Sequence, residues 1–131
     1  TMEDMVYHCK AAVRGGGGAC FVVGDMPFGS YLTTDDAVRN AARLMKEGGV
    51  DAIKLEGGAR VAAHVRAIVD AGIPVIGHVG LTPQTHAALG GFTLQAKSLA
   101  DATALCEDAR ALETAGACVV VLEMVPCQVA H

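Results

Sequence analysis

The sequence predicts an α/β fold of the (β/α)8 TIM-barrel type, and two observations lead to this prediction. Helical and strand patterns alternate along the 131 residues, which implies parallel strands joined by helices. Each of the four expected strands also ends in an ionisable residue followed closely by Gly or Pro, namely Asp25, Glu56, His78 and Glu123. An open doubly wound sheet gathers such residues at one switch point, whereas every strand of a barrel can contribute to one site.

The chain is short for a complete barrel. A (β/α)8 barrel usually has about 250 residues, whereas this chain has 131, begins at Thr1 rather than Met and stops at His131 soon after an expected strand. We therefore expect residues 1–131 to form a single partial barrel domain and to be a piece of a longer protein.

Apolar residues at helical spacing, and short apolar runs bounded by glycine, place the individual elements. The expected helices cover residues 1–14, 35–47, 59–71 and 98–114, with a shorter helix over 83–89. The expected strands cover residues 19–23, 73–77 and 118–122, and a further strand lies within residues 49–58. Capping residues support these boundaries: Thr1 with Asp4, Thr33 or Thr34, Thr82, and Ser98 with Asp101 at helix starts, and Gly72 and Gly116 at helix ends.

The composition excludes several classes of protein. A net charge of -4 and an aromatic content of 4% provide neither the basic surface nor the stacking side chains of a nucleic-acid binder. The longest apolar runs are too short to cross a bilayer, so no membrane association is expected. The five cysteines contain no C-x-x-C pair, which argues against a disulfide framework and a thiolate zinc site and favours reduced thiols.

The stretch GVDAIKLEGG, residues 49–58, carries two charges within an apolar strand. Lys54 and Glu56 are two residues apart and therefore share one face of the strand, while Ile53 and Leu55 take the other face. A lysine in a buried strand must be paired or functional, because burying an ammonium group alone is very costly. Lys54 is thus expected to hold an anionic substrate such as a carboxylate, or else to form an internal ion pair without a substrate role.

Two carboxylates suggest a metal ion. Asp25 offers a hard oxygen ligand for Mg²⁺ after the first expected strand, although an Asp in this position also commonly caps a turn. Glu56 is a candidate second carboxylate near the ion, directly or through water, with a solvated loop carboxylate as its alternative.

His78 and Glu123 suggest proton chemistry. His78 can donate a hydrogen bond to substrate, or it can be a structural histidine that only packs. Glu123 follows five apolar residues, so its carboxylate is expected to be desolvated and to act as a general base near neutral pH. The alternative is a buried carboxylate tied to Lys54 or to a backbone donor.

Five motifs together resemble ketopantoate hydroxymethyltransferases, also called 3-methyl-2-oxobutanoate hydroxymethyltransferases. The motifs are DMPFGSY at 25–31, DAIKLEGG at 51–58, PVIGHVGLTPQ at 74–84, GGF at 90–92 and VLEMVP at 121–126. They occur in order along nearly the whole chain, and motifs of this length are specific.

The resemblance implies a (β/α)8 barrel of which this chain supplies about strands three to six. It also implies Mg²⁺-dependent transfer of a hydroxymethyl group from 5,10-methylenetetrahydrofolate to α-ketoisovalerate, giving ketopantoate through an enolate, in pantothenate and coenzyme A biosynthesis. The family's roles fall on residues already selected: Asp25 as metal ligand, Glu56 near the metal, Lys54 and His78 as substrate contacts and Glu123 as general base. A homo-oligomer is expected, located in the cytoplasm, or in the mitochondrial matrix if the source is eukaryotic.

Departures from the family pattern limit this expectation. The second metal-ligating aspartate of the family lies on a strand that this chain does not contain, so the 131 residues alone are expected to bind Mg²⁺ weakly and to turn over little or no substrate. Ala96 stands where glycine is usual, which leaves the backbone geometry of that loop open, and Met124 stands where cysteine is common.

Two alternatives remain open. One is another Mg²⁺-enolate barrel enzyme, such as a relative of phosphoenolpyruvate mutase or isocitrate lyase, although the reactive cysteine loop usual in that group is not visible. The other is a non-catalytic truncated piece that only assembles with partner subunits.

Overall fold

Four parallel strands form one sheet in the order in which they occur along the chain. In the computed structural model, which describes residues 1–130, these strands are β1 (Val23–Asp25), β2 (Ala52–Glu56), β3 (Val75–Gly80) and β4 (Val119–Glu123). Each strand pairs in parallel with the next. A doubly wound sheet reverses its strand order at a switch point, whereas this sequential order is consistent with a segment of a barrel.

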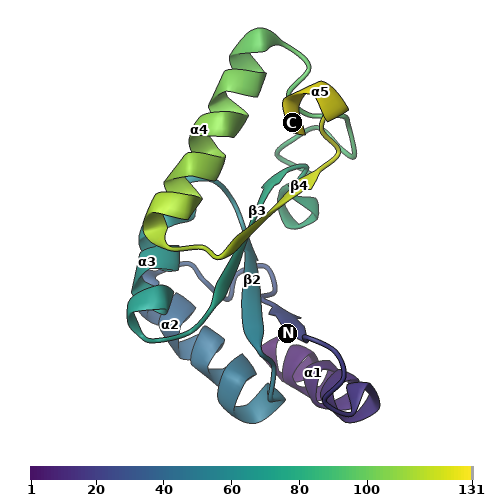
Figure 1. Ribbon diagram of the computed structural model, residues 1–131, viewed down its shortest axis with the longest axis vertical. Coiled ribbons are helices and arrows are strands. Elements are labelled where there is room, and N and C mark those ends of the chain that lie inside the picture. The colour runs from purple at the N-terminus through teal and green to yellow at the C-terminus, as the bar shows by residue number, and fades with distance from the viewer. Residues whose placement is uncertain (131) are drawn as a thin grey trace.

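The helices α2 (Thr34–Arg43), α3 (Ala62–Asp70) and α4 (Leu99–Ala115) connect the strands and lie along one side of the sheet. Helix α1 (Met2–Gly16) precedes β1, and the short α5 (Cys127–Ala130) follows β4. Figure 1 shows α2, α3 and α4 in a row beside the sheet, with α2 packed on α3 and α3 packed on α4. Among residues 1–130, no helix is both long enough and apolar enough to cross a membrane.

The core lies between the sheet and this row of helices. Ile53 and Leu55 of β2 are fully buried, as the alternation of the strand predicts. Gly77 of β3 also faces the helices, since a Cβ atom added there would lie only 2.6 Å from Cδ1 of the buried Leu112 in α4. The absence of a side chain at this position therefore lets α4 approach the sheet closely.

Most expected elements are confirmed within two or three residues. Thr1 and Asp4 form a capping box at the start of α1, the Thr33 hydroxyl caps α2, and the Ser98 hydroxyl accepts the Asp101 N–H at the start of α4. The expected helix over 35–47 ends in a π-helical turn, η1 (Leu44–Gly48), and that over 59–71 begins as a 3-10 turn, η2 (Ala59–Val61). Gly72 and Gly116 both have positive φ, as expected of helix ends.

Two strand boundaries were predicted wrongly. The expected strand over 19–23 pairs only from Val23 onward, because at Val22 the N–H is taken by the Asp51 carboxylate rather than by a neighbouring strand. The expected strand over 73–77 begins at Val75 and continues to Gly80. His78 therefore lies inside β3, where its position is fixed by ladder pairing rather than by a loop.

The short helix expected over 83–89 is also wrong. Only a single 3-10 turn forms there, η3 (Pro83–Thr85), and it is followed by turns with hydrogen bonds between residues three apart. The expected N-cap, Thr82, makes no side-chain bond to the backbone of this turn; its hydroxyl lies 2.6 Å from that of Thr85.

Ala96 adopts a left-handed backbone conformation with φ of 54°. A side chain is strained in this region because its Cβ crowds the following carbonyl, at a cost of roughly 1–2 kcal/mol. Glycine, which the resemblance leads one to expect at position 96, would therefore adopt this backbone conformation with less strain than alanine. The strained residue lies beside Met124, whose carbonyl accepts the Gln95 N–H at 2.8 Å.

We expect Ala96→Gly to leave the protein as stable or up to about 1 kcal/mol more stable, because relief of strain exceeds the extra freedom that glycine gains on unfolding. Ala104→Gly, at an exposed site inside α4, should instead destabilise by about 1 kcal/mol. Chemical denaturation of both variants measures this difference. A loss of stability in Ala96→Gly as large as in Ala104→Gly would contradict the assigned strain.

Candidate active site

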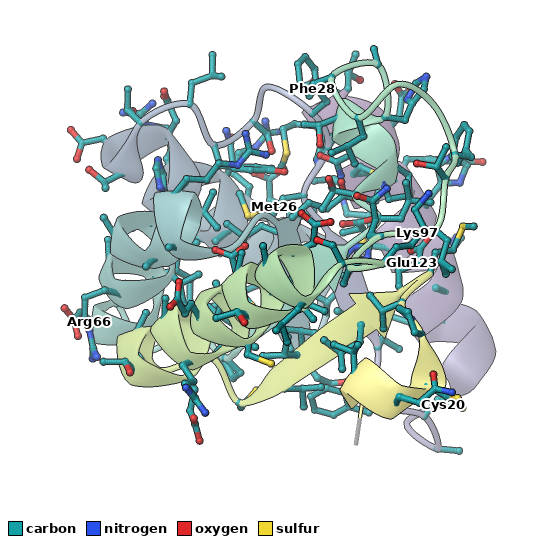
Figure 2. All side chains as sticks on the ribbon, turned by 90° about the horizontal axis from the view of Figure 1, so that it is seen from above. Cys20, Met26, Phe28, Arg66, Lys97 and Glu123 are labelled. Carbon is teal, nitrogen blue, oxygen red and sulfur yellow. The ribbon has the colours of Figure 1, made fainter. Side chains whose placement is uncertain are left out.

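The register of the sheet brings the selected residues to its carboxyl end on one face. Asp25 pairs with Lys54, Glu56 pairs with His78, and Glu123 pairs with Gly80. Residues paired across parallel strands share a face, and this face is opposite to the one that packs on the helices. Figure 2 looks down on this end of the molecule and shows Glu123 near the middle of the view, whereas Arg66 lies at the outer rim.

Lys54 lies between two carboxylates. Its Nζ is 2.8 Å from Asp25 Oδ1 and 3.7 Å from Glu56 Oε1, and its side chain is 20% exposed. The ion pair that the sequence left open as the alternative to a substrate contact is therefore present. Its remaining exposure leaves the ammonium accessible from the open face of the sheet.

Asp25, Lys54, Glu56, His78 and Glu123 form a charged cluster, and His78 contacts residues on both sides of it. Its side chain is 3% exposed; Nδ1 lies 3.4 Å from Lys54 Nζ and 3.5 Å from Glu56 Oε1, while Nε2 lies 3.1 Å from Glu123 Oε2. His78 thus lies between Lys54 and Glu56 on one side and Glu123 on the other, and its Nε2 is buried without a hydrogen bond of good geometry.

The expected burial of Glu123 is wrong. Its side chain is 39% exposed, and the neighbouring Val119 and Val121 are exposed as well. The cause is the position of β4, which pairs only with β3 and forms an edge of the four-stranded sheet. The apolar run before Glu123 indicates a strand that is built for burial, but in the described residues nothing covers its open face.

Sequence reasoning assigned no role to two residues that the structure places beside Glu56. The Tyr31 hydroxyl donates a hydrogen bond to Gln84 Oε1 at 2.9 Å and accepts one from the Glu56 backbone N–H at 3.4 Å. The Gln84 backbone N–H in turn donates to Glu56 Oε2 at 3.0 Å. Burial raises the pKa of Tyr31, and the negative charges of Glu56 and Asp25 act in the same direction. Tyr31 ends the motif DMPFGSY and Gln84 ends the motif GLTPQ. These motifs are the feature of the sequence from which a role of the two residues could have been predicted.

The donor set is compatible with a magnesium ion. Asp25, Glu56 and Glu123 bring three carboxylates to a cluster whose permanent cation is Lys54, and Asp25 Oδ1 is buried without a hydrogen bond of good geometry. Among residues 1–130, no three His, Cys, Asp or Glu side chains form a complete metal site. Magnesium is commonly held by one or two carboxylates and completed by water and substrate, which is what these residues can offer.

Comparison with known proteins identifies the family. The family model described as ketopantoate hydroxymethyltransferase matches residues 1–131. A relative from Desulfotalea psychrophila is 60% identical over 132 aligned positions, which cover 100% of this chain and 47% of the relative. A relative from Heliobacterium modesticaldum is 56% identical, and the alignment covers 100% of this chain and 48% of the relative. Both are named 3-methyl-2-oxobutanoate hydroxymethyltransferase.

The chain spans about half the length of the curated relatives it matches. The match nevertheless includes every strand of the sheet and all five residues of the charged cluster. The chain therefore belongs to the ketopantoate hydroxymethyltransferase family.

Proposed function

We propose that this chain supplies a large part of the active site of a 3-methyl-2-oxobutanoate hydroxymethyltransferase. The reaction transfers a hydroxymethyl group from 5,10-methylenetetrahydrofolate to α-ketoisovalerate and gives ketopantoate for pantothenate biosynthesis. The observation that carries the proposal is the convergence of Asp25, Lys54, Glu56, His78 and Glu123 on one face at the carboxyl end of the sheet. Relatives at 56–60% identity carry this name.

The charges suggest how substrate is held. An α-keto acid is an anion, and the Lys54 ammonium is a cation that is accessible from the open face of the sheet. Asp25 would hold Mg²⁺ directly and Glu56 through water, and the ion would supply Lewis acidity toward the keto group. Lys54 then both pairs with the carboxylates of Asp25 and Glu56 and binds the substrate carboxylate.

Glu123 is the proposed general base. Its partial exposure leaves the carboxylate able to reach a substrate on the open face, where it removes the proton from the carbon next to the ketone. The His78 ring, whose Nε2 lies 3.1 Å from Glu123 Oε2, limits the positions that this carboxylate can take. The enolate produced forms the new C–C bond with the one-carbon unit of the folate. The bonds between this carbon and the folate nitrogens break, water supplies the hydroxyl oxygen, and tetrahydrofolate leaves.

The assembly around this site is also part of the proposal. We take β1 to β4 as strands three to six of a (β/α)8 barrel, the remaining strands covering the open face on which Val119 and Val121 are exposed. Exposed apolar side chains elsewhere, including Phe21 and Phe28, favour a homo-oligomer. The relatives are bacterial, which favours the cytoplasm.

Exchange of the C3 proton of α-ketoisovalerate into D₂O tests the proposed base without folate. In the complete protein with Mg²⁺, we expect Glu123→Gln to slow this exchange by about 10²–10⁴-fold, because the shape is kept and the base is lost. Glu107→Gln, a change to an exposed residue on α4, should have no effect. Exchange at the normal rate in Glu123→Gln would remove this residue as the base, and no exchange in the unmodified protein would refute the proposed function.

Lys54→Gln tests the substrate contact. A hydrogen bond to a charged group contributes about 1.5–3 kcal/mol, so the KM for α-ketoisovalerate should rise roughly ten- to hundredfold. Lys46→Gln, which removes an exposed lysine far from the site, should leave the KM unchanged. Steady-state kinetics of the complete protein gives both values, and an unchanged KM in Lys54→Gln would restrict Lys54 to internal pairing.

A further inference from the structure

Glu56 forms a closed ring of hydrogen bonds with Tyr31 and Gln84. Its backbone N–H donates to the Tyr31 hydroxyl at 3.4 Å, and that hydroxyl donates to Gln84 Oε1 at 2.9 Å. The ring closes where the backbone N–H of Gln84 donates to Glu56 Oε2 at 3.0 Å. Tyr31 follows β1, Glu56 ends β2 and Gln84 follows β3, so the ring ties the loops after β1 and β3 to the end of β2.

Gln84 makes a second tie through its amide nitrogen. Nε2 donates to the carbonyl of Met26 at 2.9 Å, and Met26 is fully buried directly after Asp25. Figure 2 shows Met26 in the middle of the view. With Oε1 accepting from Tyr31 and Nε2 donating to Met26, both atoms of the side-chain amide have partners and its orientation is fixed by them.

The local fold explains why the Gln84 N–H is free to bind a carboxylate. Gln84 is the second residue of η3, a 3-10 turn that begins with Pro83. The first N–H groups of a helical turn have no partner within the turn, and proline has no N–H at all. The Thr82 side chain leaves this N–H unbonded, and the Glu56 carboxylate of β2 takes it instead.

We propose that Gln84 is a positioning residue for the Glu56 carboxylate and for the Asp25 backbone, and that Tyr31, Gln84 and Glu56 act as one unit. Glu56 Oε2 is held by the Gln84 N–H, which leaves Oε1 directed toward Lys54 and His78. The carboxylate is 3% exposed, so its orientation is set by these contacts rather than by water. This inference rests on the proposed function only in so far as Glu56 serves a metal site.

Two single variants of the complete protein, their double combination and two controls test the proposal. Gln84→Leu keeps the backbone N–H but removes both side-chain bonds, and Tyr31→Phe removes one hydroxyl from an otherwise unchanged ring. Their matched controls are Gln128→Leu and Tyr7→Phe, which change exposed residues on α5 and α1.

The first readout is the affinity for Mn²⁺, a paramagnetic substitute for Mg²⁺, measured by electron paramagnetic resonance. Each site variant should weaken binding by about tenfold, the lower end of the effect of partners that orient metal ligands. The double variant Tyr31→Phe/Gln84→Leu should also bind only about tenfold more weakly, because either change alone already breaks the ring, while the Gln84 N–H still holds Glu56 Oε2 in all three variants. Losses that multiply, or unchanged affinity with a lower melting temperature only, would overturn the proposal.

The second readout is the His78 ring signal in the NMR spectrum of the metal-free protein at one fixed pH. Its Nδ1 lies 3.5 Å from Glu56 Oε1, so a displaced carboxylate should shift this signal in both site variants and in neither control. If the unmodified protein neither binds Mn²⁺ nor exchanges the substrate proton, yet His78 shifts as expected, the proposed function fails and the positioning role stands. An unshifted His78 signal in both site variants overturns the positioning role.

Discussion

The Glu56 carboxylate is almost completely removed from water, and the geometry of the charged cluster depends on how this buried charge is compensated. An isolated carboxylate in such a place would cost several kcal/mol. Lys54, His78 and the Gln84 N–H surround it instead, and they come from β2, from β3 and from the turn after β3. The requirement to compensate one charge thus fixes three segments of the chain relative to one another.

The opposite face of the sheet imposes a second constraint, which concerns space rather than charge. A Cβ atom at Gly24 would lie 3.3 Å from side-chain atoms of Leu44 and Val50, and Gly77 has still less room. Glycine at these positions lets the helices close on the sheet and fill that face with apolar contacts. The polar residues of the sheet lie on the other face, where Lys54 and Glu123 keep partial exposure.

Sequence reasoning predicted the alternation of helices and strands and the gathering of the five site residues, since these follow from periodicity and from the parallel arrangement; it left the ion pair of Lys54 as one of two interpretations. It did not predict the exposure of Glu123, because an apolar strand reads the same whether or not a neighbour covers it. The ring through Tyr31 and Gln84 was also missed, because both residues lie in loops, where spacing along the chain says little about contacts in space. The short helix after β3 was predicted wrongly for a related reason. The Gln84 N–H in the first turn donates to the Glu56 carboxylate and not to the Thr82 side chain.

The backbone at Met124 has a consequence for the sequences that this position can accept. Its φ of 46° lies in the left-handed region, directly after Glu123. Unbranched side chains, asparagine and glycine can occupy that region at modest cost, whereas valine, isoleucine and threonine are severely strained there. Which residues position 124 accepts therefore depends on branching of the side chain at Cβ rather than on its polarity. A methionine can replace a cysteine there, whereas a valine, although intermediate in size, cannot.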